Sequence, residues 1–188
     1  MNNIDWEKII DQITNETVNS FGRLTGLAIN WKPNQDSWSI AQNIEHLIIT
    51  NESYFGEIEK LNNKRYSNIP YYSKFNFIPS ILGKTILQSV QSRSSKKTKT
   101  FPIWEPNLNP IPVKIIEHFS EHQLELKKEI RNSKELLKKN TVICSPANRY
   151  IVYNLETAFD IIIAHEQRHV KQSKKVLDLF KRKNNIHR

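Results

Sequence analysis

The 188-residue sequence has one cysteine, only four glycines and no apolar run approaching the length of a membrane span. A single cysteine, Cys144, cannot form a disulfide within the chain, which is typical of proteins from a reducing compartment. A membrane-spanning helix needs about 20 apolar residues. The N-terminus also lacks the charged and apolar segments of a secretory signal. These absences predict a cytoplasmic protein without a membrane segment.

Cys144 has two possible roles. A nucleophilic cysteine needs a neighbouring group that stabilises its thiolate. The segment around it, Thr141 to Pro146, contains no histidine and has the composition of a turn-prone loop. We therefore expect Cys144 to be a small apolar residue rather than a catalytic one.

The apolar residues of the chain recur at helical spacing over four long segments. Steps of three and four residues predict amphipathic helices at about 4–27, 40–61 and 112–138, and a fourth that is capped by Asn154 and runs to about residue 181. Ser39 and Gln42 have the spacing of a capping box at the start of the second helix. Four such helices bury one another, so the fold class is all-α, a four-helix bundle. We expect one domain over residues 1–182 and a basic tail over 183–188.

A long crossover connection between the second and third helices occupies residues 62–111. Its length excludes a tight turn, and its apolar spacing predicts a short helix near Pro79–Gln91. The connection is rich in aromatic residues, which either pin it to the bundle or line a substrate pocket; we favour pinning. These residues are Tyr66, Tyr71, Tyr72, Phe75, Phe77, Phe101 and Trp104.

Two histidines interrupt the apolar seam of the last helix. His165 and His169 fall in a seam that alternates steps of three and four residues from Leu155 to Leu179, and Gln172 follows them. Residues on such a stripe face a partner helix. Side chains at i and i+4 lie one above the other, close enough to share a divalent ion. The alternative is structural, since a buried histidine often satisfies only a backbone carbonyl.

The same residues match H-E-x-x-H, the motif of zinc metalloproteases, in which the glutamate is the general base. The extended metzincin pattern would need Gly and His where this chain has Gln172 and Lys175. Only 19 residues follow His169, and His187 is their one histidine. A protease is therefore disfavoured, and a third ligand is expected from elsewhere in the chain.

The start of the second helix supplies a candidate. Trp38-Ser39, followed by His46-Leu47, together with His165-Glu166-x-x-His169-x-x-Gln172, resembles the DinB-like superfamily of metal-binding four-helix bundles. The specific part of this resemblance covers residues 38–47 and 165–172. It implies that His46, His165 and His169 bind a divalent ion, nickel or zinc, with coordination positions left open. It assigns no role to Gln172.

Spacing alone leaves the position of His46 open. It lies one residue off the apolar seam of its helix, hence about 100° around the helix axis. This shoulder position suits a ligand at the mouth of a bundle, but it equally suits an exposed histidine.

The resemblance also implies chemistry. Three neutral histidines leave a bound ion positively charged, which can favour a thiolate or an activated water. We expect a transferase that adds a low-molecular-weight thiol to a small-molecule electrophile; the alternatives are a hydrolase of a small substrate and a non-catalytic bundle that forms a homodimer. Glu166 is either a group that orients a ligand or moves a proton, or an exposed carboxylate. Arg168 and the basic cluster at 93–99 are candidate contacts for an acidic thiol.

The basic clusters and the other three histidines give weaker evidence of function. The formal net charge is +9, with basic clusters at 93–99 and 171–188, but neither cluster contains interleaved aromatic residues that would stack on bases. Nucleic-acid binding is therefore not expected. His118 and His122 form a second i,i+4 pair, whose helix column continues with Glu125 and Glu129. We interpret that column as a solvated face, and assign no role to His187.

Overall fold

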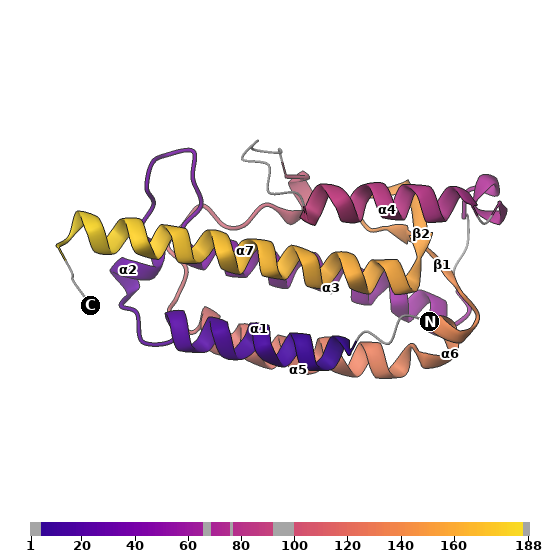
Figure 1. The fold of residues 1–188 in the computed structure, drawn as a ribbon, viewed down its shortest axis with the longest axis horizontal. Helices are drawn as coiled ribbons and strands as arrows, with labels where there is room; N and C mark the ends of the chain where they lie inside the picture. The colour runs from indigo at the N-terminus through magenta and orange to yellow at the C-terminus, as the bar shows by residue number, and fades with distance from the viewer. Residues whose placement is uncertain (1–4, 66–68, 76, 92–99, 186–188) are drawn as a thin grey trace.

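The computed structural model describes residues 5–65, 69–75, 77–91 and 100–185. Four long helices form a bundle: α1 (Trp6–Phe21), α3 (Ile40–Asn62), α5 (Ile115–Asn132) and α7 (Leu155–Lys183). Contacts join α1 to α5, α5 to α3, α3 to α7 and α7 to α1, so each helix packs against two others (Figure 1). The predicted all-α bundle is confirmed.

The directions of these helices explain the long connection. In Figure 1, α1 and α7 run from right to left, whereas α3 and α5 run from left to right. The neighbours α3 and α5 are therefore parallel. A parallel pair cannot be joined by a tight turn, so the chain must return along the bundle between them.

The returning segment contains the predicted short helix, α4 (Phe77–Gln91), with the 3-10 turns η1 (Tyr71–Lys74) and η2 (Pro102–Trp104) on either side. Helix α4 lies outside the four-helix core and packs on α7 and on the strand β2 (Asn148–Asn154) (Figure 1). Gly83 makes this approach close, because a Cβ there would lie 2.8 Å from Cγ2 of Thr157 and 2.9 Å from Cβ of Tyr153. The crossover therefore forms an extra layer over α7.

Two predicted helices are shorter than expected. The first ends at Phe21, and a separate turn of helix, α2 (Gly26–Asn30), follows with Thr25 as its N-cap. The predicted 112–138 helix divides at Ser133 into α5 and α6 (Lys134–Lys138). The apolar spacing continued across both breaks because the residues on either side pack against the same core, so periodicity alone could not locate them.

The segment around Cys144, expected as a loop, forms a two-stranded antiparallel hairpin. Strand β1 (Val142–Ser145) pairs with β2 from Val142 opposite Asn154 to Ser145 opposite Asn148, with an irregularity between Cys144 and Ser145. Pro146 and Ala147 make the turn. Cys144 is buried, as expected for a small apolar residue. The hairpin delivers the chain to the start of α7.

The apolar seam of α7 departs from the prediction in its second half. Leu179, expected in the core, is exposed, whereas Ser173, Leu177 and Phe180 are buried. A helix with 3.6 residues per turn drifts from a strict seven-residue repeat, so the buried stripe moves around the helix beyond His169.

No described helix is long and apolar enough to cross a membrane.

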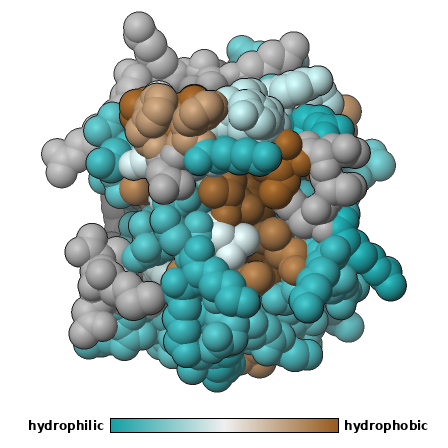
Figure 2. Space-filling view, turned by 90° about the vertical axis from the view of Figure 1, so that its right-hand side faces the viewer, coloured by the Kyte–Doolittle hydropathy of each residue, from teal (hydrophilic) through white to brown (hydrophobic). Residues whose placement is uncertain are grey.

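Apolar side chains are exposed where α4 begins. Tyr71, Phe75, Phe77 and Ile81 are exposed, and the rings of Tyr71 and Phe77 each lie within 6.3 Å of the Phe75 ring. Figure 2, which views the end of the molecule where the hairpin lies, shows apolar side chains surrounded by hydrophilic ones. Whether these exposed residues take part in the homodimer expected from the sequence is not tested, and the homodimer stays a prediction.

Candidate metal centre

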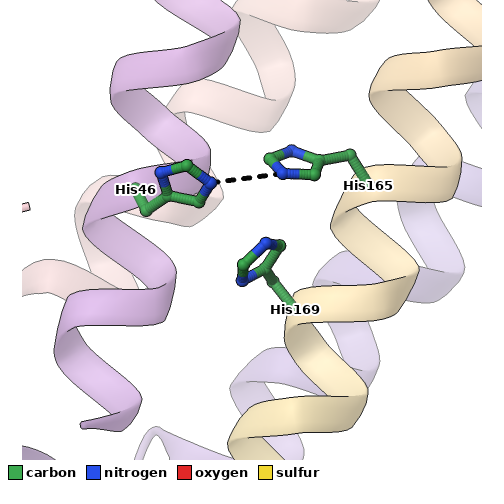
Figure 3. Close-up of side chains that lie close together, drawn as sticks. All are labelled: His46, His165 and His169. Atoms are coloured by element: carbon green, nitrogen blue, oxygen red, sulfur yellow. Dashed lines mark hydrogen bonds between the residues drawn. The ribbon is translucent and has the colours of Figure 1, made fainter. Parts of the chain in front are cut away.

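Three histidines from two helices point toward one another. Figure 3 shows His46 on α3 facing His165 and His169 on α7. One ring nitrogen from each lies within 4.8 Å of the others. The ring centroids are 4.9 Å apart for His46 and His165, 4.7 Å for His46 and His169, and 4.5 Å for His165 and His169. These are the three residues expected from the sequence.

The backbone of the crossover orients His46. Its Nδ1 lies 2.6 Å from the carbonyl oxygen of Trp104, so Nδ1 carries the hydrogen and donates it. The Trp104 indole in turn donates to Oγ of Ser53, at 3.0 Å. Asn107, three residues farther on, is bound to Glu45 through its backbone N–H and its side-chain amide, at 2.6 and 2.7 Å. These contacts hold the ring with its Nε2 lone pair toward the other two histidines.

A side-chain amide orients His169 in the same way. Nδ2 of Asn43 donates to the carbonyl oxygen of Ser39, at 2.8 Å, which leaves Oδ1 of Asn43 as an acceptor. Nδ1 of His169 lies 2.8 Å from that oxygen and donates to it. Ser39 is the N-cap of α3, and its capping box with Gln42 is formed as predicted. The helix start that positions His46 therefore also fixes the tautomer of His169.

One pair of ligand nitrogens already has the spacing expected when both bind a single ion. Nε2 of His46 lies 3.2 Å from Nε2 of His165. Two nitrogens bonded to one ion at about 2.0–2.1 Å, at tetrahedral or octahedral angles, lie about 2.8–3.4 Å apart. Hydrogen bonds from the second ring nitrogen to an oxygen are the usual support of a metal-binding histidine. The residues present therefore fit a divalent metal ion.

Burial keeps the three imidazoles neutral, as metal binding requires. Loss of hydration lowers the pKa of His165 to about 3, and the neighbouring His46 contributes to the shift. Loss of hydration also lowers the pKa of His169 well below its usual value. The pKa of His46 is lowered for the same reason, although its hydrogen bond to Trp104 opposes the shift. Each ring can therefore offer a lone pair at neutral pH.

His46 is more buried than its shoulder position suggested. Its exposed fraction is 2%. The Trp38 ring lies 4.7 Å from the His46 ring and 5.9 Å from the His169 ring, and η2 covers the other side through Trp104. The exposed alternative is wrong because two segments outside the helix cover this shoulder, and helical periodicity carries no information about them.

Sequence reasoning gave no role to Asn43 and did not place Trp104 at the histidines. Asn43 precedes His46 by three residues, about one helical turn, and this spacing was an available signal. Trp104 orients His46 through a carbonyl oxygen, which any residue would supply. Both alternatives for the aromatic residues of the crossover hold at Trp104, because its indole anchors η2 to α3 through Ser53 and it also lines a cavity beside His165.

Glu166 lies in the core, so its reading as an exposed carboxylate is wrong. Its exposed fraction is 0%, and Oε1 accepts hydrogen bonds from Nδ2 of Asn51 and Nε2 of Gln123, both at 2.7 Å. Burial raises the pKa of Glu166 to about 7. Among the described residues, the group whose ligand atoms lie within 4.8 Å of one another consists of the three histidines and does not include this carboxylate. The structure thus joins Glu166 to α3 and α5.

Arg168 supports the crossover. Its guanidinium donates to the carbonyl oxygens of Ser89 and Val90, at 3.1 and 3.4 Å, in the last turn of α4. A cation at the C-terminal end of a helix satisfies carbonyls that have no partner within the helix and complements the helix dipole. Arg168 therefore ties α4 to α7. The other candidate contact for an acidic thiol, the basic cluster at 93–99, lies outside the described residues.

Among the described residues, no third metal-ligating side chain joins the second histidine pair, His118 and His122. His118 is exposed, whereas His122 is 2% exposed and its ring stacks on Phe55 with centroids 5.1 Å apart. The prediction of a solvated face is wrong for His122, because Phe55 of α3 covers it. Gln172 is half-buried on α7, one turn beyond His169, and its role remains unassigned. His187 lies outside the described residues.

A cavity of about 120 Å³ lies beside the histidines. His165 forms part of its wall, and the rest comes from α3, α4, η2, the hairpin and α7. Its aromatic residues include Tyr54, Trp104 and Tyr153. A molecule in this cavity would contact the same side chain that faces His46 and His169.

Comparison with protein families identifies one match. The family model of the DinB superfamily matches residues 9–173, most of the chain and all three histidines. The resemblance based on residues 38–47 and 165–172 is thereby confirmed. Searches of curated proteins and of solved structures gave no match.

Proposed function

We propose that this chain, which belongs to the DinB superfamily, binds one divalent metal ion through His46, His165 and His169 and transfers a low-molecular-weight thiol to a small electrophile. The observation that carries the proposal is the convergence of three neutral imidazoles, two of them oriented by hydrogen bonds at Nδ1. Three protein ligands with an open position are the usual arrangement of a catalytic zinc site, whereas structural sites have four.

Nickel and zinc are the proposed ions because imidazole nitrogen is a favoured ligand of both. A bound divalent ion would supply a positive charge that favours thiolate over thiol. In the transfer, the thiol gives up its proton to solvent and its sulfur forms a bond to the electrophilic carbon. The bond from carbon to the leaving group breaks, and the leaving group takes the electron pair.

The chain's own residues have three tasks in this proposal. Trp104 and Asn43 hold two imidazoles in the tautomer that presents Nε2. Trp38 and η2 limit access of water to the ligands from two sides. The cavity next to His165 offers a place for the electrophile within reach of the histidines.

Thiol transfer is favoured over hydrolysis by the surroundings of Glu166. A metal-dependent hydrolase of the H-E-x-x-H type uses this glutamate as a general base. Here the carboxylate is fully buried and receives two hydrogen bonds from α3 and α5. A thiol needs no such base, because its pKa is already near 8.5 and falls further beside a cation.

Thiol conjugation in the presence of metal tests the proposal. Protein loaded with nickel or zinc should accelerate the reaction of cysteine or glutathione with 1-chloro-2,4-dinitrobenzene, and His46→Ala should abolish the acceleration. His118→Ala is the matched control, since it removes an exposed histidine. If thiols are inert while ester cleavage depends on the same three histidines, the protein is a hydrolase. If neither reaction occurs with metal bound, the non-catalytic alternative replaces both.

A further inference from the structure

We propose that the cavity beside His165 is a subsite for an uncharged, apolar group about the size of one aromatic ring. This inference rests on the proposed function for its biological meaning, because such a group would belong to the electrophile. The binding itself requires only the cavity. The subsite therefore specifies a substrate class: neutral electrophiles with a compact apolar body.

In the part of the chain that the structure describes, the lining of the cavity contains no acidic or basic residue of the Asp, Glu, Lys or Arg type. Its residues include Ile86 and Val90 of α4, Ile161 of α7 and the ring of Trp104. A charged group that entered would lose hydration without gaining an ion pair from the lining, which disfavours its binding. A neutral apolar group would lose only unfavourable contact with water. The wall thus selects against charge.

The hydroxyl groups in the wall are already engaged with other protein atoms. Oγ1 of Thr50 donates to the carbonyl oxygen of His46, at 2.8 Å. The hydroxyls of Tyr54 and Tyr153 are hydrogen-bonded to each other at 2.6 Å, and the Ser145 side chain hydrogen-bonds Tyr153. Burial raises the pKa of Tyr153 to about 12, so its hydroxyl stays neutral. A ligand rich in hydrogen-bonding groups would have to break these bonds.

The size of the cavity limits the guest. Its volume is about 120 Å³, and an engineered apolar cavity of about 150 Å³ holds benzene. A single ring therefore fits with a small adjustment of the wall. His165 lies in the wall and also faces the other two histidines, so a substituent on the ring can reach the metal centre.

Two anchors fix the wall formed by α4. Arg168 holds the last turn of this helix, which carries Val90. Gly83 allows the helix to pack closely against Thr157 and Tyr153. The wall formed by η2 is fixed through the indole of Trp104 and Ser53. The carbonyl oxygen of Trp104 also orients His46. The subsite and the metal centre therefore share η2.

Fluorine NMR of three matched probes tests this subsite on the full chain as purified, without thiol. The probes are 4-fluorotoluene, 4-fluorobenzylamine, which is protonated at neutral pH, and 4-fluorobenzenesulfonate, whose anion is a weak metal ligand. We expect 4-fluorotoluene to bind with an affinity at least tenfold higher than either charged probe. Equal binding of all three, or no binding of 4-fluorotoluene at its solubility limit, would overturn the proposal.

A cavity-filling variant locates the binding. Val90→Phe places a ring in the cavity and should weaken 4-fluorotoluene at least tenfold. Leu87→Phe is the matched control on the same helix, at a position that does not line the cavity, and should leave binding unchanged. Thermal melting checks that both variants fold. If Val90→Phe does not fold, Ile86→Phe, which alters another lining residue, takes its place. Unchanged binding in the cavity-filling variant would refute the assigned location.

The outcomes separate this inference from the proposed function. Probe binding without thiol transfer would retain the subsite and reject the transferase. Thiol transfer with no selectivity for the neutral probe would retain the transferase and reject the subsite.

Discussion

The chain contains two pairs of histidines with the same i,i+4 spacing, and the structure gives them different environments. His165 and His169 on α7 meet a third histidine from α3. In the other pair, on α5, His118 is exposed and His122 stacks on Phe55. Spacing along a helix places two rings on one face, but a metal site also needs a ligand from a neighbouring helix and acceptors that fix the tautomers. At the metal centre, the carbonyl oxygen of Trp104 is such an acceptor for His46, and Oδ1 of Asn43 is one for His169.

The largest predicted difference between the pairs is metal content. The double variant His165→Ala/His169→Ala should lose the bound ion entirely, because one imidazole cannot hold it. As controls, the single variants His118→Ala and His122→Phe, which alter the pair on α5, should each keep about one ion per chain. Elemental analysis of dialysed protein measures both. Full metal content in the first variant would exclude the α7 pair as ligands.

Removing the ion should affect stability by a smaller amount. An ion that binds only the folded chain stabilises it by about 4 kcal/mol at a thousandfold excess over its Kd. For a chain of this length we expect chelation to lower the Tm by about 8–16 °C. The comparison is sharpened in the variant His165→Ala/His169→Ala, whose Tm should not respond to chelator. A wild-type Tm that is equally insensitive would indicate that ordinary hydrogen bonds satisfy the histidines.

The α5 pair should reveal itself through pH instead. Burial lowers the pKa of His122 from 6.5 to about 4, mainly by loss of hydration. Between these values the unfolded chain binds a proton that the folded chain does not, so stability falls as pH falls through this window. His122→Phe should therefore be more stable than wild type by about 2 kcal/mol at pH 5, with the gain nearly absent above pH 7.

Urea unfolding at pH 5 and pH 8 measures this gain. In comparison, His118→Phe removes only the smaller cause of the low pKa of His122 and leaves its burial in place, so its gain at pH 5 should be smaller than that of His122→Phe. A gain for His122→Phe that is equal at both pH values would show that packing, rather than protonation, is responsible.

The smallest predicted effect concerns the polar cluster next to the metal centre. Among the described residues, Oε2 of Glu166, Oδ1 of Asn51 and Oε1 of Gln123 are buried without a hydrogen-bond partner. Glu166→Gln introduces an amide that can donate to one of these oxygens, so we expect it to raise stability by about 1 kcal/mol. Metal content should stay unchanged. Loss of the ion in Glu166→Gln, measured by elemental analysis, would place this carboxylate in the metal centre after all.

The sequence predicted the features that depend on helical periodicity. The four long helices, the capping box at Ser39 and the inward direction of His165 and His169 follow from spacing and local hydrogen bonding. His46 needed the family resemblance, since its own helix pattern left it on the shoulder of the core face.

Other features depend on segments distant in the sequence. The hairpin around Cys144 was missed because its strands are short and contain turn-forming residues. The burial of Glu166 and His122 depends on partners from other helices, which periodicity on α7 or α5 cannot reveal. The cytoplasmic location, the homodimer and the single domain over residues 1–182 stay predictions from the sequence.

X-ray absorption spectroscopy of the metal-loaded protein identifies the atoms bound to the ion. We expect three imidazole nitrogens at about 2.0–2.1 Å from one ion, with oxygen ligands such as water in the remaining positions. In His46→Ala the imidazole scattering should fall by one ring. A sulfur ligand near 2.3 Å, which would implicate Cys144, or a spectrum unchanged by loss of His46, would contradict a metal centre built from these three histidines.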